Sequence, residues 1–129
     1  MDRASKNVHF EGNWEGANKQ VAVKLSLIIF EDSGSQVVYC PALDVYGYGV
    51  TEKEALDSFK VCLGEFLKYT LNKGTLHSEM AKMGWTIRKK KFTPPLFSKL
   101  LKINEDFSDI FNNHNFKKID QNINIPILA

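Results

Sequence analysis

The chain has 129 residues, 43% of them hydrophobic and 25% charged, which is enough apolar material for one globular domain and too little for a second. Its formal net charge of +2 excludes binding to nucleic acid or an anionic membrane by bulk field alone, so any basic contact surface must be local. Cys40 and Cys62 lack metal-ligand spacing, so we expect two buried thiols in a reducing compartment, with no disulfide, metal site or cofactor. The polar N-terminal residues contain no apolar signal core, which predicts a cytoplasmic protein.

The first fifty residues predict a loosely ordered segment followed by three strands. Residues 1–19 mix glycine and asparagine with scattered charges, as loosely ordered segments do. Apolar residues at alternate positions from Val21 to Ile29 predict a half-buried strand, and residues 36–40 predict its return strand after a polar turn. Residues 43–50 are expected to form a short third strand.

A long amphipathic helix follows over residues 51–73. Thr51 and Glu54 have the spacing of a capping box, and Gly74 provides a left-handed stop. Its apolar stripe consists of Ala55, Leu56, Phe59, Cys62, Leu63, Phe66, Leu67 and Leu71. A short helix over residues 76–82 and a fourth strand over 85–89 complete an α+β domain at residues 20–91.

Residues 92–129 form a C-terminal extension. The two prolines after Thr93 predict the first turn of a new helix, interrupted near Asn104 and stopped by residues 112–115. The alternation of Ile123, Ile125 and Ile127 then predicts an edge strand, which needs a partner sheet in its own chain or in a second subunit.

One stretch carries a family resemblance. A hairpin, a proline-containing crossing segment and a threonine-capped helix follow one another at the spacing of HicB-type antitoxins. The matching residues are Pro41, Leu43, Asp44, Val45, Gly49, Thr51, Glu54, Ala55 and Leu56. With its flanking elements, the region that resembles this family covers residues 20–90.

The resemblance implies a partial ribonuclease H-like fold, in which a three-stranded antiparallel sheet and a fourth strand pack on one long helix. It also implies that the chain binds a HicA-type mRNA-cleaving toxin and masks its RNA site, without nuclease chemistry. Many family members bind operator DNA through a C-terminal helix-turn-helix or ribbon-helix-helix. Residues 93–129 match neither motif, so we expect this segment to support a homodimer, and operator binding has no clear motif behind it.

The residues themselves predict binding and no catalysis. A ribonuclease H nuclease needs carboxylates that converge on metal ions, the first of them on the first strand, and residues 21–30 contain no acid. His9, His77 and His114 lack a nucleophile at recognisable spacing, so surface or structural roles are expected. Cys40 lies beside a proline without an identifiable base, which favours packing.

Two groups are candidate contact sites. Asp44, Tyr46 and Tyr48 lie beside the capped helix, where they either anchor a protein partner or pack against Trp85. The only dense basic run consists of Arg88, Lys89, Lys90 and Lys91. It either contacts phosphates or an acidic partner, or is a solvated strand end.

Two functions remain open from the sequence. The first is an antitoxin-like protein that neutralises a HicA-type toxin. The second is an orphan HicB-like module that binds proteins or nucleic acid and has no toxin partner.

Overall fold

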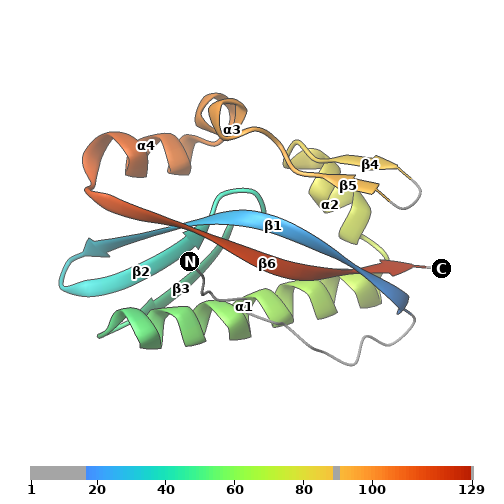
Figure 1. The fold of residues 1–129 in the computed structure, drawn as a ribbon, viewed down its shortest axis with the longest axis horizontal. Helices are drawn as coiled ribbons and strands as arrows, with labels where there is room; N and C mark the ends of the chain where they lie inside the picture. The colour runs from blue at the N-terminus through green and yellow to red at the C-terminus, as the bar shows by residue number, and fades with distance from the viewer. Residues whose placement is uncertain (1–16, 89–90, 129) are drawn as a thin grey trace.

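The computed structural model describes residues 17–88 and 91–128, and the side chains of residues 20–88 and 91–126 (Figure 1). An antiparallel sheet of four strands lies at its centre, in the order β3-β2-β1-β6. The strands of this sheet are β1 (Ala17–Asp32), β2 (Ser35–Cys40), β3 (Val45–Gly49) and β6 (Phe116–Leu128). The α+β class and the antiparallel sheet are therefore as predicted.

Helices lie on both faces of this sheet. The long helix α1 lies along one face, and α3 and α4 lie over the other (Figure 1). A separate two-stranded hairpin lies beside α2 (Figure 1). These elements are α1 (Glu52–Lys73), α2 (Leu76–Lys82), β4 (Thr86–Arg88), β5 (Lys91–Thr93), α3 (Phe97–Ile103) and α4 (Glu105–Asn113).

The predicted fourth strand of the sheet was wrong. The segment predicted at residues 85–89 is β4, which pairs only with β5. The fourth strand is instead the tail, β6, which pairs with β1 from Phe30 opposite Phe116 to Ala17 opposite Leu128. In this register Val23 lies opposite Ile123, so the alternating apolar residues of both strands share one face.

The first hairpin follows from its turn. Ser33 and Gly34 both have positive φ, at 53° and 85°, as the two central residues of a type I′ turn require. The turn places Ser35 opposite Asp32 and continues the pairing along β2. β1 begins at Ala17, inside the segment predicted to be loosely ordered, and residues 1–16 lie outside the described part.

Strand β2 is buried on both faces. Val37, Val38, Tyr39 and Cys40 are each at most 2% exposed. Such a run has no polar side because α1 covers one face of the sheet and the C-terminal helices cover the other (Figure 1).

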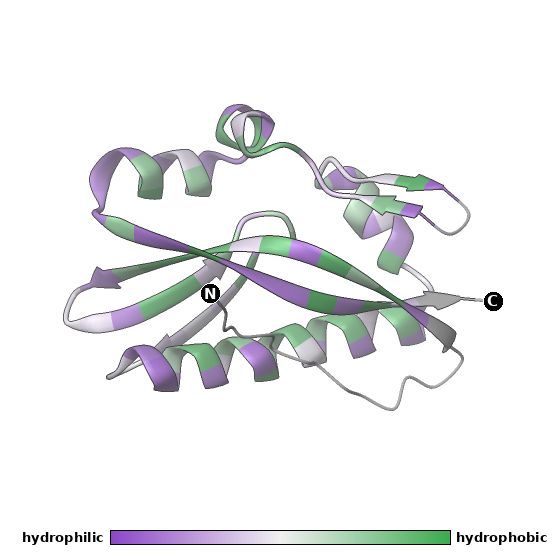
Figure 2. Cartoon of the chain, viewed as in Figure 1, coloured by the Kyte–Doolittle hydropathy of each residue, from purple (hydrophilic) through white to green (hydrophobic). Residues whose placement is uncertain are grey.

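Helix α1 begins as predicted, with one difference in the cap. The Glu54 amide donates to Thr51 Oγ1 at 3.1 Å, but the Glu54 carboxylate accepts from the amide of Val50, at 2.9 Å, not from that of Thr51. The helix ends at Gly74, whose φ is 70°. Hydrophobic and hydrophilic residues alternate along the helix (Figure 2). Cys62 was predicted to be buried and is exposed, because it lies outside the buried stripe.

The helix contacts β3 closely at Gly47. A β-carbon at this position would lie 2.5 Å from the carbonyl oxygen of Ala55 and would also overlap the amide of Phe59. Glycine at this point lets the backbones of helix and strand approach. This contact fixes how β3 and the turn before it lie relative to α1.

The C-terminal helical segment differs from the prediction at its start. Pro94 and Pro95 precede α3, which begins at Phe97, so they are not in its first turn. The predicted interruption at Asn104 is confirmed. The side chain of Asn104 accepts from the amide of Phe107 at 3.0 Å and thus caps α4. The predicted stop at residues 112–115 is also confirmed, since α4 ends at Asn113.

Candidate functional site

The candidate site begins in the turn between β2 and β3. Pairing of β2 stops at Cys40, immediately before Pro41, and the amide of Asp44 donates to the Cys40 carbonyl at 2.8 Å. Asp44 has a φ of 56°, a left-handed conformation that aspartate and asparagine tolerate better than most residues. The turn therefore holds the exposed Asp44 side chain at the end of the sheet.

A buried tyrosine joins this turn to the C-terminal helices. The hydroxyl of Tyr39 donates to Asp44 Oδ1 at 2.7 Å and accepts from Asn104 Nδ2 at 2.8 Å. Because Asn104 also caps α4, one hydroxyl connects β2, the Asp44 turn and the start of that helix. Burial, followed by the hydrogen bond to Asp44, raises the pKa of Tyr39.

Three tyrosine rings continue from this network to the surface. The ring of Tyr39 stacks on Tyr46 with centroids 4.1 Å apart, and Tyr46 stacks on Tyr48 at 6.1 Å. Tyr48 is 58% exposed. The pKa of Tyr46 is raised to about 12, first by burial and then by the negative charge of Asp106. Asp44, Tyr46 and Tyr48 are thus brought together, and Asp106 of α4 lies near them.

Trp85 takes no part in this stack. Packing of Tyr46 and Tyr48 against it was the alternative expected from the sequence. Instead, the buried Trp85 donates through Nε1 to the carbonyl of Ala42 at 2.7 Å. This hydrogen bond holds the turn between β2 and β3, and Tyr48 stays open to solvent.

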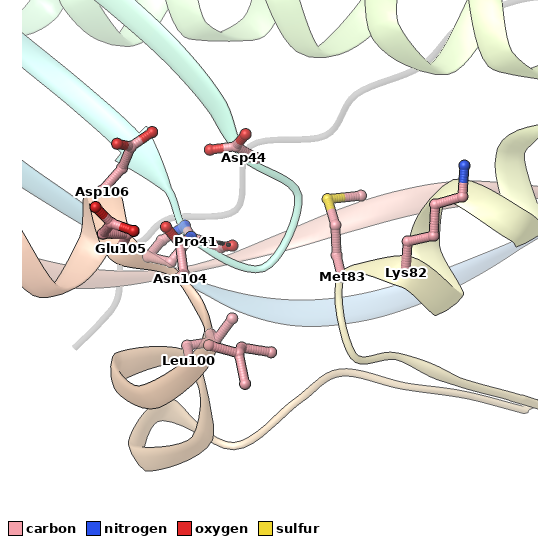
Figure 3. Close-up of a pocket in the computed structure, with 9 residues that line it drawn as sticks. Pro41, Asp44, Lys82, Met83, Leu100, Asn104, Glu105 and Asp106 are labelled. Atoms are coloured by element: carbon pink, nitrogen blue, oxygen red, sulfur yellow. Dashed lines mark hydrogen bonds between the residues drawn. The ribbon is translucent and has the colours of Figure 1, made fainter.

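A cleft of about 300 Å³ opens beside Asp44. It lies between the end of α2 and the junction of α3 with α4, with Pro41 in its wall (Figure 3). The residues around this cleft are Pro41, Asp44, Lys82, Met83, Leu100, Ile103, Asn104, Glu105 and Asp106. Its volume lies at the small end of the range for ligand sites, about 300–1,000 Å³.

The cleft carries more negative than positive charge. Figure 3 shows Glu105 and Asp106 on the same side as Asp44, with Met83 and Lys82 across from them. Lys82 is 73% exposed in its side chain and contacts Glu79 at 3.4 Å. The three carboxylates belong to two elements far apart in the sequence, and together with the tyrosines they form what we call the acidic-aromatic surface: Asp44, Tyr46, Tyr48, Glu105 and Asp106.

Three of the five residues of this surface were predicted from the sequence, and two were not. Asp44, Tyr46 and Tyr48 are near neighbours in the chain, whereas Glu105 and Asp106 join them through the fold. A local signal for the second pair existed, because Asn104 followed by two acids is typical of a helix N-terminus. Nothing in that signal indicates which surface the helix start will meet.

The basic run lies elsewhere, on the β4–β5 hairpin. Arg88 and Lys91 are exposed and directly opposite each other in the register of the two strands. Like charges in such a pair are destabilising. Lys89 and Lys90 lie outside the described residues.

The remaining candidate residues have structural surroundings. The ring of His77 meets Phe92 edge-on at 5.2 Å, and its buried Nε2 has no hydrogen-bond partner in the described part of the chain. The ring of His114 lies 4.9 Å from that of Phe30. His9 lies outside the described residues. Cys40 is fully buried, and burial raises the pKa of its thiol to about 12, so the thiol stays protonated.

Within the described residues, no group of three or more His, Cys, Asp or Glu is arranged to hold a metal ion. No helix in the described part of the chain is long and apolar enough to cross a membrane. Comparison with models of protein families, with curated proteins and with solved structures finds no match.

Proposed function

We propose that this chain is an antitoxin-like binding protein of the HicB type. In this proposal it docks on a small basic HicA-type toxin in the cytoplasm and masks the RNA site of that toxin by steric cover. The β1-β2-β3-α1 order, with the crossing segment from Pro41 to the cap at Thr51, supports a partial ribonuclease H-like fold of this type.

The acidic-aromatic surface is the observation that carries the proposal. Exposed tyrosine is frequent among residues that dominate protein interfaces, and Tyr48 is held by stacking, so it loses little freedom on binding. The neighbouring carboxylates of Asp44, Glu105 and Asp106 complement a basic partner, which speeds encounter and disfavours acidic proteins.

The proposed action is binding without catalysis. A ribonuclease H nuclease needs its first carboxylate on the first strand, and β1 has no acid between Val21 and Phe30; its two acids, Glu31 and Asp32, stand at its end beside the hairpin turn. A homodimer remains part of the proposal. Since β6 pairs along its length with β1 of its own chain, the C-terminal extension would contribute through its outer surface and not by exchange of this strand.

The test is coexpression with the product of a short neighbouring reading frame that encodes a basic, double-stranded-RNA-binding-like protein. We expect the two proteins to copurify, and we expect the chain to stop RNA cleavage by the partner at equal molar amounts. Unaffected cleavage would contradict the proposal.

A matched pair of variants tests the surface. Asp44→Asn with Tyr48→Ala removes one charge and one anchor, and we expect at least tenfold weaker inhibition of cleavage. Glu65→Gln with Val61→Ala alters an exposed charge and an exposed apolar residue on α1, and we expect inhibition to stay within twofold of the unchanged chain. If both pairs of substitutions weaken inhibition equally, the acidic-aromatic surface is not part of the interface with the toxin.

A second candidate function is nucleic-acid binding by the β4–β5 hairpin. It is favoured by the cross-strand pair of Arg88 and Lys91, for which the described residues supply no ion-pair partner, since a phosphate between two opposed cations relieves their repulsion. A mobility-shift assay at low salt tests it. We expect Arg88→Ala with Lys91→Ala to abolish the shift and Lys68→Ala with Lys73→Ala, on α1, to retain it.

A further inference from the structure

The cleft beside Asp44 has two chemically different parts. One part is apolar and consists of Pro41 from the turn after β2, Met83 from the end of α2, and Leu100 and Ile103 from α3. The other part is the side of the cleft that holds Asp44, Glu105 and Asp106 (Figure 3). A ligand that fills it therefore needs an apolar stem and a cationic end.

The carboxylates of the cleft remain available to such a cation. Tyr39 uses only Oδ1 of Asp44, and an ionised carboxylate has further lone pairs on both oxygens. Glu105 and Asp106 lie in the first turn of α4. Among the described residues, neither of these two side chains has an ion-pair partner.

The one cation at the cleft does not neutralise this side. The ammonium group of Lys82 is paired with Glu79, on its own helix, at 3.4 Å. Three carboxylates thus face an opening in which the described side chains place no other positive charge. Because α3 and α4 meet here at a cap fixed by Asn104 and Tyr39, the charges are held in position before any ligand arrives.

We propose that this cleft takes a single arginine side chain from a protein partner. The methylene groups of the arginine pack against Met83, Leu100 and Pro41, and its guanidinium group meets the carboxylates. Arginine fits better than lysine because its planar fork donates to two carboxylates at once, whereas an ammonium group acts as a compact, strongly hydrated charge. The volume, about 300 Å³, leaves room for one long side chain.

The choice of a protein partner rests on the proposed function. The test of the arginine site does not, because it uses a peptide as the probe. The probe is the peptide acetyl-Gly-Arg-Gly-amide, titrated into the isotopically labelled full chain and followed by amide chemical shifts. The control probe has citrulline in place of arginine, which keeps the shape and removes the charge. We expect saturable shifts with the arginine peptide at Asp44, Asn104, Glu105 and Asp106, and at least tenfold weaker binding of the citrulline peptide.

A conservative double variant locates the effect. Asp44→Asn keeps a side chain that tolerates the left-handed turn and accepts from Tyr39, and Asp106→Asn keeps the shape of the second carboxylate. We expect this pair to weaken arginine binding at least tenfold, and Glu65→Gln on the opposite side of the sheet to leave it unchanged. Equal binding of both peptides, shifts elsewhere on the chain, or an unaffected double variant would overturn the inference.

The two proposals fail separately. Binding of the arginine peptide by a chain that retains no toxin would contradict only the antitoxin function. Copurification of a toxin with a chain that ignores the arginine peptide would contradict only the arginine site. If the double variant does not fold, the comparison of arginine with citrulline on the unchanged chain still decides the inference.

Discussion

Removal of the Tyr39 hydroxyl tests whether the network at the candidate site stabilises the fold. Tyr39→Phe keeps the buried ring and its stacking on Tyr46 at 4.1 Å, and removes the two hydrogen bonds to Asp44 and Asn104. Any change in stability therefore comes from the hydroxyl and not from packing.

The expected loss follows from the surroundings of each partner. A neutral hydrogen bond contributes about 0.5–1.5 kcal/mol, and one to a charged group about 1.5–3 kcal/mol. Asp44 is exposed, so water replaces the lost hydrogen bond to its carboxylate. The contribution of this bond therefore lies toward the lower end of the range for charged groups. Asn104 is half-buried; among the described residues its Nδ2 then keeps only a long contact to the Pro41 carbonyl, at 3.5 Å, while its Oδ1 still caps α4. We expect Tyr39→Phe to lower the free energy of unfolding by about 2 kcal/mol.

Urea unfolding, followed by the fluorescence of the buried Trp85, measures this change. With a slope of about 2 kcal/mol per molar urea, the midpoint falls by about 1 M and the slope stays constant. The control is Tyr48→Phe, on an exposed ring of the same stack, for which we expect a change within about 0.5 kcal/mol. If Tyr39→Phe costs no more than this control, the network does not stabilise the fold.

Two further predictions concern the sheet. Gly47→Ala forces β3 away from α1, because its β-carbon would lie 2.5 Å from the Ala55 carbonyl oxygen. We expect the free energy of unfolding, measured with urea, to fall by about 3 kcal/mol or more. An unchanged urea midpoint would contradict the close approach of β3 and α1. Stability should also fall as pH rises above about 9. The unfolded chain then releases protons from Cys40 (ordinary pKa 9.0) and Tyr39 (10.0), whereas burial raises both pKa values in the folded chain. Each group contributes at most about 1.4 kcal/mol per pH unit, less where solvent screens it. In Cys40→Ala the fall, measured as urea midpoints between about pH 8 and 11, should begin nearer pH 10, and an identical curve would refute this.

Local features of the fold could be predicted from the sequence. The hairpin turn, the cap at Thr51 and the range of α2 depend on residues within a few positions of one another, so their signals are contained in short stretches. Pairing between distant strands was not predictable in this way. The alternating apolar residues around Ile123 indicate a strand. Such a strand could pair with the edge of any sheet, and the sequence pattern does not indicate that its partner is β1.

The candidate site likewise has a part that could be predicted from local sequence and a part that could not. Asp44, Tyr46 and Tyr48 could be grouped because a single turn and strand carry them. Their connection to α4 depends on a hydrogen bond between Tyr39 and Asn104, which are far apart in the sequence. The prediction that Cys62 is buried was wrong for a different reason. The apolar stripe of α1 is broad, and the sequence does not determine where the edge of the buried face lies.

The pairing of β1 with β6 has a consequence for how the chain assembles during synthesis. β1 leaves the ribosome before the other described elements, and β6, its partner on this side, is the last of them to be made. Until then the nascent chain displays a long strand edge with unpaired backbone groups, the kind of template that other chains join. Closure of the central sheet is thus a late step that requires contact between distant parts of the chain, which slows folding relative to the local formation of α1.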